Sequence, residues 1–451
     1  MIEGGLSTKV QSQRIQGSAT LKTLSIRLVG ITLVILITAC QPTPSPVPTM
    51  TSTPTEVPRT ATPQPTPTPD PKSLIQGTVR LWLDWNPMEL DSLHKVISSF
   101  HDQYPAVAFA LTYYPHDDLR SALELAITED NAPTMIFAPS SWGPELWQDG
   151  RLLDLTIQVD KDLRSSIDPL AWNQVNFDGA VIGLPLERQG IVLYRNRLIV
   201  SEAAGTLEEL VSMGQQLKGD LSVGFGLDFG FMYSVSQLAA CDGNLFDAKG
   251  NFNLEDEVGH CWLRLLRTLR DAGRVWFNSD EDLTLFEMGS SGWLMESTLE
   301  SDRLSRLEGV RDLVIDPWPM YSETGNRLAG FIWTENLYLI KGSSPDDVEA
   351  SWAFARFLLS PEAQIILSDP EGANHLPALR DLMLSGPLQI QMVASLSSGV
   401  PLPLQPDLSL YIEPLEGAVR AVSVQGASPE LALDIAFTKI EQALINAGSG
   451  E

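Results

Sequence analysis

The chain is short of several residue types, and each shortage excludes a class of function. Its 451 residues include 30 lysines and arginines against 57 aspartates and glutamates, a formal net charge of -27. Nucleic-acid-binding proteins need a basic surface, so no nucleic-acid partner is expected. Only five histidines are present, and they do not show the HExxH spacing of a zinc enzyme. We therefore predict neither a metal site nor a cofactor.

Motifs for catalysis are missing as well. In Gly289-Ser-Ser-Gly292 the glycines are wrongly spaced for the nucleophile elbow of a hydrolase. Acidic residues are abundant, so counting alone does not rule out a glycosidase pair of carboxylates, but no pattern selects one. We predict that the chain is not an enzyme. Two alternatives stay open, a surface-anchored glycosidase-like hydrolase and a ligand-sensing receptor.

Near the amino terminus, one apolar run is too short for an ordinary membrane-spanning helix. It extends from Leu28 to Ile37, which suits the hydrophobic region of a signal peptide. Basic residues precede it, and it ends in Ile37-Thr-Ala-Cys40, which resembles a bacterial lipobox. We predict that residues 1–39 are a lipoprotein signal peptide and that Cys40 is lipidated. The chain is then anchored on the extracytoplasmic face of the cell membrane.

A segment rich in proline and threonine follows the lipobox and extends to about residue 72. Proline at nearly every second or third position favours polyproline II and leaves little to pack in a core. We predict that residues 40–76 form the lipidated cysteine and a disordered tether. The sequence leaves open whether this tether carries O-linked glycans.

Cys241 and Cys261 are the other two of the three cysteines. They form an even pair in an exported chain, where oxidation is permitted. A disulfide between them would stabilise the fold by up to about 3 kcal/mol in the chain-entropy model. The alternative is a pair of buried free thiols.

Ordered structure is expected from Gly77 onward. Asn86-Pro-Met-Glu89 is typical of a helix start, with Asn86 as the N-cap and Glu89 as its reciprocal partner. Strand, helix, strand, helix, strand at this spacing indicates a parallel sheet covered on both faces, an α/β fold. The expected strands are 78–84, 107–113 and 135–138, with helices starting after Asn86 and over 119–127.

Helices dominate the second half of the chain. Thr206-Leu-Glu-Glu209 is a capping box that opens one of them. Apolar residues recur at helical spacing in four further segments, namely 232–240, 259–272, 347–359 and 428–445.

Several stretches occur in an order that is typical of one protein family. Residues 132–155 read APTMIFAPSSWGPELWQDGRLLDL, and residues 177–196 read FDGAVIGLPLERQGIVLYRN. Further matching segments are 226–230, 242–247, 285–289, 314–319, 340–343 and 350–364. From Gly77 to about Leu379 the chain resembles an extracellular solute-binding protein of the maltose-binding type, a component of ABC importers. Each fragment is weak alone, and their collinear order is the specific signal.

The resemblance implies a two-lobed periplasmic-binding-protein-like fold (type II), with a ligand cleft between lobes that hinge segments join. Lobe 1 would comprise residues 77–188 plus 329–374, and lobe 2 residues 193–312 plus 377–448. The implied partners are a small-molecule ligand, namely a sugar, and the permease subunits of an ABC transporter. A monomer is expected, capturing a carbohydrate, in particular an oligosaccharide, for delivery to the permease.

Candidate ligand contacts come from two sources. Ligands of open α/β sheets bind beyond the carboxyl ends of strands, which selects residues after the first and third strands. These are Asp84, Trp85, Asn86, Ser140, Ser141 and Trp142. The resemblance adds Glu187, Asp228, Phe231, Tyr233, Glu296, Trp333, Thr334, Glu335 and Asn336.

The chemistry of this set favours a sugar. Pyranose rings present apolar C–H faces to aromatic planes, and their hydroxyls need carboxylate or amide partners. Tryptophans and acidic residues supply both kinds of contact. Core packing is the alternative for each tryptophan, and it is the expected role of Trp82, Trp262 and Trp352.

Two departures from the family pattern bear on the ligand. Glu296-Ser-Thr-Leu299 stands where the family often has Asn/Ser-Gly-Pro-Trp, so a stacking tryptophan is missing there. Ile332-Trp333 replaces a commonly glycine-rich approach to the cleft. A distinct oligosaccharide, a small polyol and a glycerol-phosphate-like ligand are all compatible with these departures.

Overall fold

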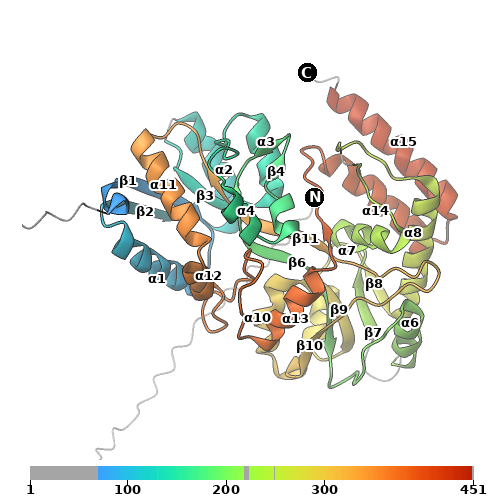
Figure 1. Cartoon of the computed structure of the whole chain (residues 1–451). Helices are drawn as coiled ribbons and strands as arrows, with labels where there is room; N and C mark the ends of the chain where they lie inside the picture. Colours follow the sequence, from blue (N-terminus) through green and yellow to red (C-terminus); the bar gives the residue numbers. More distant parts are fainter. Residues whose placement is uncertain (1–69, 130, 218–222, 248, 449–451) are drawn as a thin grey trace, which may run out of the picture. The chain divides into compact units, whose positions relative to one another are not determined.

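The computed structural model describes residues 70–129, 131–217, 223–247 and 249–448. The predicted signal peptide, the lipidation site Cys40 and the tether up to residue 69 lie outside the described residues. Within the described part, helices cover a ten-stranded sheet (Figure 1). Eight of its strands follow the order β2-β1-β3-β11-β6-β9-β7-β8, and two more pair beside this path, β10 with β6 and β12 with β11.

The first βαβαβ segment agrees with the sequence prediction. β1 (Gly77–Leu83) pairs in parallel with β2 (Val107–Tyr113) and with β3 (Met135–Pro139). The connecting helices are α1 (Pro87–Gln103) and α2 (His116–Thr128).

The start of α1 shows how local chemistry sets an element boundary. The Asn86 side chain accepts hydrogen bonds from the backbone N–H groups of Met88 and Glu89. In return, Glu89 Oε2 accepts the Asn86 backbone N–H at 2.6 Å. This reciprocal capping box satisfies backbone groups that the first helical turn leaves without partners. It also fixes the position of Glu89.

Two long strands occupy the middle of the sheet. β6 (Leu184–Asn196) is buried along its whole length. β11 (Phe331–Leu339) is antiparallel to β3 on one side and to β6 on the other. The sheet is therefore mixed. The parallel pairing predicted for residues 78–84, 107–113 and 135–138 is confirmed in β1, β2 and β3. β6 and β11 lie between two groups of elements (Figure 1).

The second half of the sheet continues from β6. β9 (Ser291–Ser297) and β10 (Leu313–Asp316) both pair antiparallel with β6. β7 (Val223–Asp228) runs parallel to β9 and to β8 (Arg274–Trp276). β12 (Val400–Pro401) adds a short parallel pairing to β11, and β4 (Asn176–Phe177) and β5 (Ala180–Val181) form a separate ribbon.

The remaining elements are helices. Those before β6 are η1 (Pro71–Leu74), η2 (Ser140–Trp142), α3 (Gly143–Gln148), α4 (Lys161–Ser166) and α5 (Pro169–Asn173). Between β6 and β11 lie α6 (Leu207–Gln216), α7 (Phe231–Ser234), η3 (Val235–Cys241), α8 (Asp256–Leu269), η4 (Arg270–Ala272), α9 (Glu281–Glu287), η5 (Thr298–Glu300), α10 (Ser301–Ser305) and η6 (Glu308–Val310). The last are α11 (Pro345–Leu358), α12 (Pro361–Leu367), α13 (Pro387–Leu396), α14 (Ser409–Ser423) and α15 (Pro429–Gly448).

Two large hydrophobic cores flank the central strands. The first packs β1, β3, α1 and α11 together, with Phe100 and Phe354 fully buried at its centre. The second packs β7 and β9 against α8 and α14. Trp262 lies in this second core with no exposed surface, which confirms its predicted core role. Trp82 and Trp352 are half-buried and pack against core residues.

Three segments differ from the sequence prediction. Residues 232–240 form a short α-helix and a 3-10 helix instead of one α-helix, and the Gln237 side chain bonds both backbone groups of Ala329. α14 was not among the predicted helices, and Pro414 lies inside it, although proline usually ends a helix. The 3-10 helix η1 lies within the range assigned to the tether, so folded structure begins before Gly77.

The structure contains the predicted disulfide between Cys241 and Cys261, which are 20 residues apart. It joins η3 to α8 within the second core.

Replacing both cysteines with alanine is expected to lower the free energy of unfolding by about 3 kcal/mol. Urea unfolding with and without a reductant checks this, because reduction should bring the wild type to the midpoint of the double variant. A wild-type urea midpoint that is the same with and without the reductant would contradict this prediction.

Along the described part of the chain, no helix is both long and apolar enough to cross a membrane. The same residues contain no cluster of three or more histidine, cysteine or acidic side chains that could hold a metal ion.

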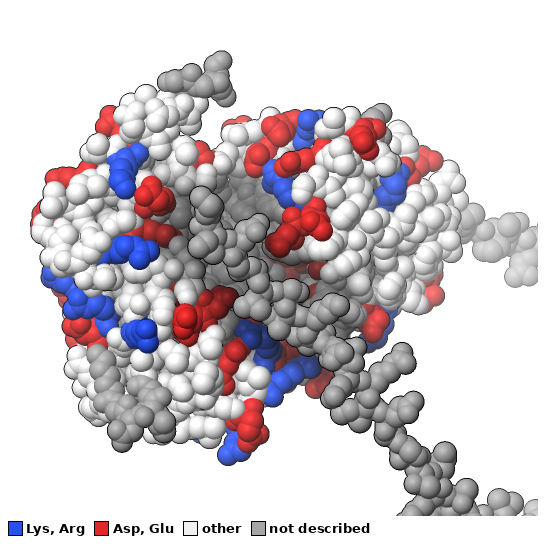
Figure 2. Space-filling view, turned by 180° about the vertical axis from the view of Figure 1, so that it is seen from behind, with Lys and Arg blue, Asp and Glu red and all other residues white. Residues whose placement is uncertain are grey.

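On the face seen from behind, acidic side chains lie on both sides of the central hollow (Figure 2).

Candidate functional site

Two opposed glutamates lie where β6 and β11 pair in the middle of the molecule. Glu187 of β6 is directly opposite Glu335 of β11. Both side chains are buried, with 6% and 8% of their surface exposed. Two residues along, Trp333 is opposite Gln189 and donates its indole N–H to Gln189 Oε1 at 2.6 Å. Since alternate residues of a strand share a face, these four side chains form one polar surface.

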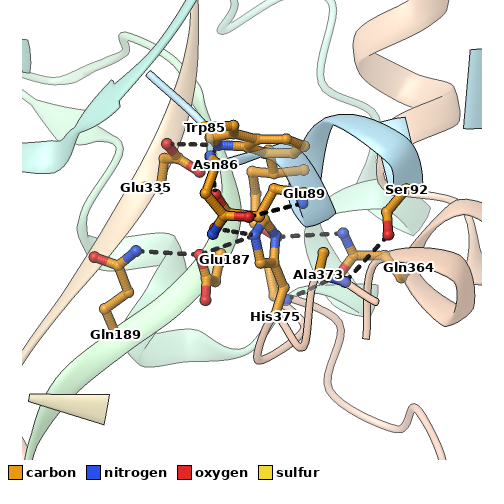
Figure 3. Close-up of polar contacts among 12 residues, drawn as sticks. Trp85, Asn86, Glu89, Ser92, Glu187, Gln189, Glu335, Gln364, Ala373 and His375 are labelled. Atoms are coloured by element: carbon orange, nitrogen blue, oxygen red, sulfur yellow. Dashed lines mark hydrogen bonds and ion pairs between the residues drawn. The ribbon is translucent and has the colours of Figure 1, made fainter. Parts of the chain in front are cut away.

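Trp85 supports this surface from the end of β1. Its indole Nε1 donates to Glu335 Oε2 at 2.9 Å and Oε1 at 3.0 Å (Figure 3). The ring packs against Phe137 and meets the edge of His375, with ring centroids 4.9 and 4.8 Å away. Because Trp85 is 3% exposed, it holds Glu335 in place rather than offering a free face for stacking.

His375 lies at the centre of the polar group, on the segment between α12 and α13. Its Nε2 is 3.2 Å from Glu89 Oε1 and 3.7 Å from Glu187 Oε2 (Figure 3). Glu187 Oε2 also accepts a hydrogen bond from Gln189 at 3.1 Å. We call Trp85, Glu89, Glu187, Glu335 and His375 the glutamate–histidine cluster. Its members come from four different parts of the chain.

Burial and mutual charge set the protonation of the cluster. Burial raises the pKa of Glu335 well above its usual range, and Glu187 adds to the effect. Burial also raises the pKa of Glu187, although His375 opposes this. For His375, burial lowers the pKa, but Glu187 and Glu89 outweigh it and raise the pKa to about 9. At neutral pH the cluster therefore holds a charged imidazolium.

A cavity of about 80 Å³ adjoins the cluster. Asn86, Glu89, Glu187 and His375 line it on one side. On the other side it is lined by Thr298, Leu299, Ser301 and Asp302, which follow β9. Asp84 lies nearby at the end of β1 and pairs with His116 at 2.5 Å. Residues from both halves of the sheet thus meet at one cavity.

A second polar group lies at the ends of β7 and β9. The Tyr233 hydroxyl donates to Glu296, at 3.0 and 3.2 Å from its two carboxylate oxygens. Burial raises the pKa of Glu296 to about 7, against the lowering effect of the Ser297 N–H and of Tyr233. Glu296 therefore changes charge near neutral pH. This pair combines an aromatic ring with an acidic group, as a sugar site requires.

Two of the predicted contacts in this half have structural partners instead. Asp228 accepts hydrogen bonds from the backbone N–H groups of Gly230, Asn278 and Ser279. Phe231 is buried, stacks on Phe331, and its backbone N–H bonds to Glu416. Asp228 and Phe231 are therefore not proposed as direct contacts of the ligand.

Three other predicted contacts lie on the side of β11 that faces away from Glu335. Thr334 and Asn336 belong to β11, and Ser140 belongs to η2. Ser140, Thr334 and Asn336 have no exposed surface, and they bond to one another or to nearby buried groups. Ser140 donates to Gln174, Thr334 to Asn336, and Asn336 to Tyr338. Because their polar groups are already satisfied inside the fold, they are not available to a ligand.

The last two predicted contacts, Ser141 and Trp142, lie apart from the cluster in η2. Ser141 is exposed, and Trp142 is half-buried with the Arg120 guanidinium 5.1 Å from its ring. This contact occupies one face of the indole.

A larger cavity, about 440 Å³, is lined by amide and apolar groups such as Gln174, Phe331 and Leu402. None of the buried carboxylates lines it, so the candidate site is the glutamate–histidine cluster with the smaller cavity and the polar groups around them.

Three residues of the site were not predicted as contacts. Gln189 is two positions beyond Glu187 on a strand, and this spacing alone could have identified it. Glu89 was assigned only a capping role, although its second carboxylate oxygen reaches His375. His375 comes close to Glu89 and Glu187 only through the tertiary fold, and no local signal marked it.

Comparison with known proteins decides the family. Residues 95–389 match the model of a family described as bacterial extracellular solute-binding protein, which is more than half of the chain. The chain belongs to this family. A maltotriose-binding protein of Pyrococcus abyssi (strain GE5 / Orsay) is 25% identical over 175 residues. That match spans 38% of this chain and 38% of the relative's own length.

Solved structures of solute-binding proteins share the fold. The maltose/maltodextrin-binding domain MalE from Bdellovibrio bacteriovorus, bound to maltotriose, has a TM-score of 0.64 at 19% identity, covering 82% of this chain and 100% of that chain. The cyclic alpha-maltosyl-1,6-maltose binding protein from Arthrobacter globiformis has a TM-score of 0.70 at 17% identity, covering 82% and 100%. This solute-binding protein therefore has the predicted two-lobed α/β fold. The matched proteins are named as binding proteins, in agreement with the predicted class of this chain.

Proposed function

We propose that this solute-binding protein captures an oligosaccharide and delivers it to the permease of an ABC transporter. The observation that carries the proposal is the buried pair Glu187 and Glu335 with Trp333 beside them on the same face. Paired carboxylates accept several hydroxyl hydrogen bonds, and an indole covers an apolar sugar face. The maltotriose- and maltose-binding relatives support the same ligand class.

Both halves of the molecule would contribute contacts. We take lobe 1 as residues 77–188 plus 329–374 and lobe 2 as residues 193–312 plus 377–448. Asp84 and Asn86 would meet the sugar from lobe 1, and Tyr233 and Glu296 from lobe 2. A ligand that touches both lobes stabilises the closed form, because only that form makes all the contacts at once.

The proposed place of action is the extracytoplasmic face of the membrane. The lipobox-like residues Ile37-Thr-Ala-Cys40 support a lipid anchor, and the proline-rich segment that follows supports a tether. A captured solute must be handed to a permease in the same membrane, so an anchor keeps the binding protein close. A semi-rigid proline-rich tether gives it the reach to dock.

A panel of sugars tests the proposal by thermal shift of the full chain. One class of oligosaccharide is expected to raise the midpoint in a saturable way, by about 2.7 kcal/mol of stability at 100 times the dissociation constant. The solution is then analysed for reaction products. Product formation would favour the hydrolase alternative, and a panel with no stabilising sugar would overturn the proposal.

A further inference from the structure

We propose that His375 is a positioning residue of the binding site, holding Glu89 and Glu187 in the geometry that receives the solute. The inference rests on the proposed function and adds a residue to it. It also assigns a role to a charged group for which simple packing gives no reason.

The backbone around His375 is fixed on both sides. The His375 N–H donates to the Leu367 carbonyl at 2.9 Å, and the next carbonyl, of Leu376, accepts the Arg188 N–H at 2.8 Å. Two residues earlier, the Ala373 N–H donates to Ser92 Oγ at 3.1 Å. The imidazole is therefore held between α1, which carries Glu89, and β6, which carries Glu187.

Only one of the two ring nitrogens of His375 has polar partners among the described residues. Nε2 faces Glu89 and Glu187, while Nδ1 is buried and has no hydrogen-bond partner among the described protein groups. His375 is 3% exposed and lines the 80 Å³ cavity. A charged imidazolium carries a proton on both nitrogens. Because the buried Nδ1–H has no acceptor among the described protein groups, the contacts of Nε2 with Glu89 and Glu187 are the side-chain polar contacts that orient the ring.

Acidic groups face His375 from the elements around it. Glu89 comes from α1, Glu187 from β6 and Glu335 from β11, and all three favour its charged form. Asp84 at the end of β1 acts on Glu335, and Asp302 of α10 lines the same cavity. Loss of the imidazolium charge would leave Glu89 and Glu187 facing each other without a cation between them. The two carboxylates would then separate or take up protons, and both changes alter the site.

The sign of the pH dependence follows from the raised pKa. The positively charged form exists below the folded-state pKa of about 9 and is lost as the pH rises through it. Loss of the His375 charge should therefore lower the affinity for the solute as the pH rises through about 9. A change in affinity near pH 7 would come from Glu296, whose pKa is about 7. Folding stability follows the same direction. The contribution from His375 is complete below its unfolded-state pKa of about 6.5 and is lost toward pH 9.

The test compares three full-length proteins by titration calorimetry with the best sugar of the panel, from pH 6 to pH 10. They are the wild type, His375→Gln, and a control, His94→Gln, at an exposed position of α1. Glutamine can still donate to the carboxylates but carries no charge. We expect His375→Gln to weaken binding about tenfold or more at pH 7, and to remove the fall in affinity near pH 9 that the wild type and the control show.

The outcomes separate this inference from the proposed function. A wild type that binds no sugar overturns the proposed function. A wild type that binds sugar with an affinity independent of pH from 7 to 10 overturns the role of His375, even if His375→Gln fails to fold. Equal affinity and equal pH profiles in His375→Gln and the wild type overturn it as well.

Discussion

Replacing Arg195 with methionine is expected to lower the free energy of unfolding by about 3–5 kcal/mol. Arg195 Nε lies 2.8 and 2.9 Å from the two carboxylate oxygens of Asp316, where β6 pairs with β10. Asp316 is 3% exposed and accepts a further hydrogen bond from Trp293. Methionine fills the space but leaves the Asp316 charge buried without its cation, which is the costly part of the change.

Two controls identify the cause of that loss. Arg264→Met removes a partner from the exposed ion pair with Glu323, and it should change stability by less than about 1 kcal/mol. Arg195→Met combined with Asp316→Leu should recover part of the loss, since no unpaired charge remains. Urea unfolding measures all three variants. Equal effects of Arg195→Met and Arg264→Met would contradict the assignment.

Replacing Trp333 with alanine is expected to weaken sugar binding about 100-fold, or about 2.7 kcal/mol. Trp333 is half-buried beside Glu335 and is fixed by its hydrogen bond to Gln189. Its ring is less buried than that of Trp85, and among the described residues no guanidinium lies over it as Arg120 lies over Trp142. Alanine removes the apolar surface on which a pyranose ring would pack. Titration calorimetry of the full chain gives the dissociation constant.

Trp352→Ala is the matched control for this prediction. Both tryptophans are half-buried and pack against a core, Trp333 against the second and Trp352 against the first. Trp352 differs because it lines an apolar pocket with Leu153 and Leu339, to which no residue of the glutamate–histidine cluster contributes. Its replacement should reduce stability and leave the dissociation constant within about twofold. If Trp333→Ala instead lowers stability and leaves sugar affinity unchanged, Trp333 is a core residue and the site is placed wrongly.

Local patterns predicted the elements whose ends depend on neighbouring residues. The capping box of Asn86 and Glu89 placed the start of α1, and residues 107–113 were predicted as the strand β2. Segments with distant partners were predicted less well. Apolar spacing suggested one α-helix over residues 232–240, whereas the structure has a short α-helix and a 3-10 helix, in which Gln237 bonds the distant Ala329. Pro414 is accommodated inside α14, where buried residues such as Leu415 and Val419 contribute to the second core.

The candidate site was predictable only in part, for a similar reason. The rule that ligands bind beyond strand ends selected Asp84 and Asn86 but does not say which face of a neighbouring strand they meet. On β11 that distinction separates Glu335, which joins the cluster, from Thr334 and Asn336, which turn to the opposite face. His375 enters the site from a segment nearly 200 residues beyond Glu187 in the chain. Only the folded structure brings the two together.

The most direct test of the central claim is a calorimetric titration of the full chain with maltotriose, alongside glycerol 3-phosphate as an anionic comparison. A site lined by Glu89 and Glu187, with Glu335 buried beside them, is predicted to bind the neutral sugar saturably, to leave it chemically unchanged, and to reject the phosphate. Saturable binding of glycerol 3-phosphate with no response to maltotriose or to longer malto-oligosaccharides would contradict the account.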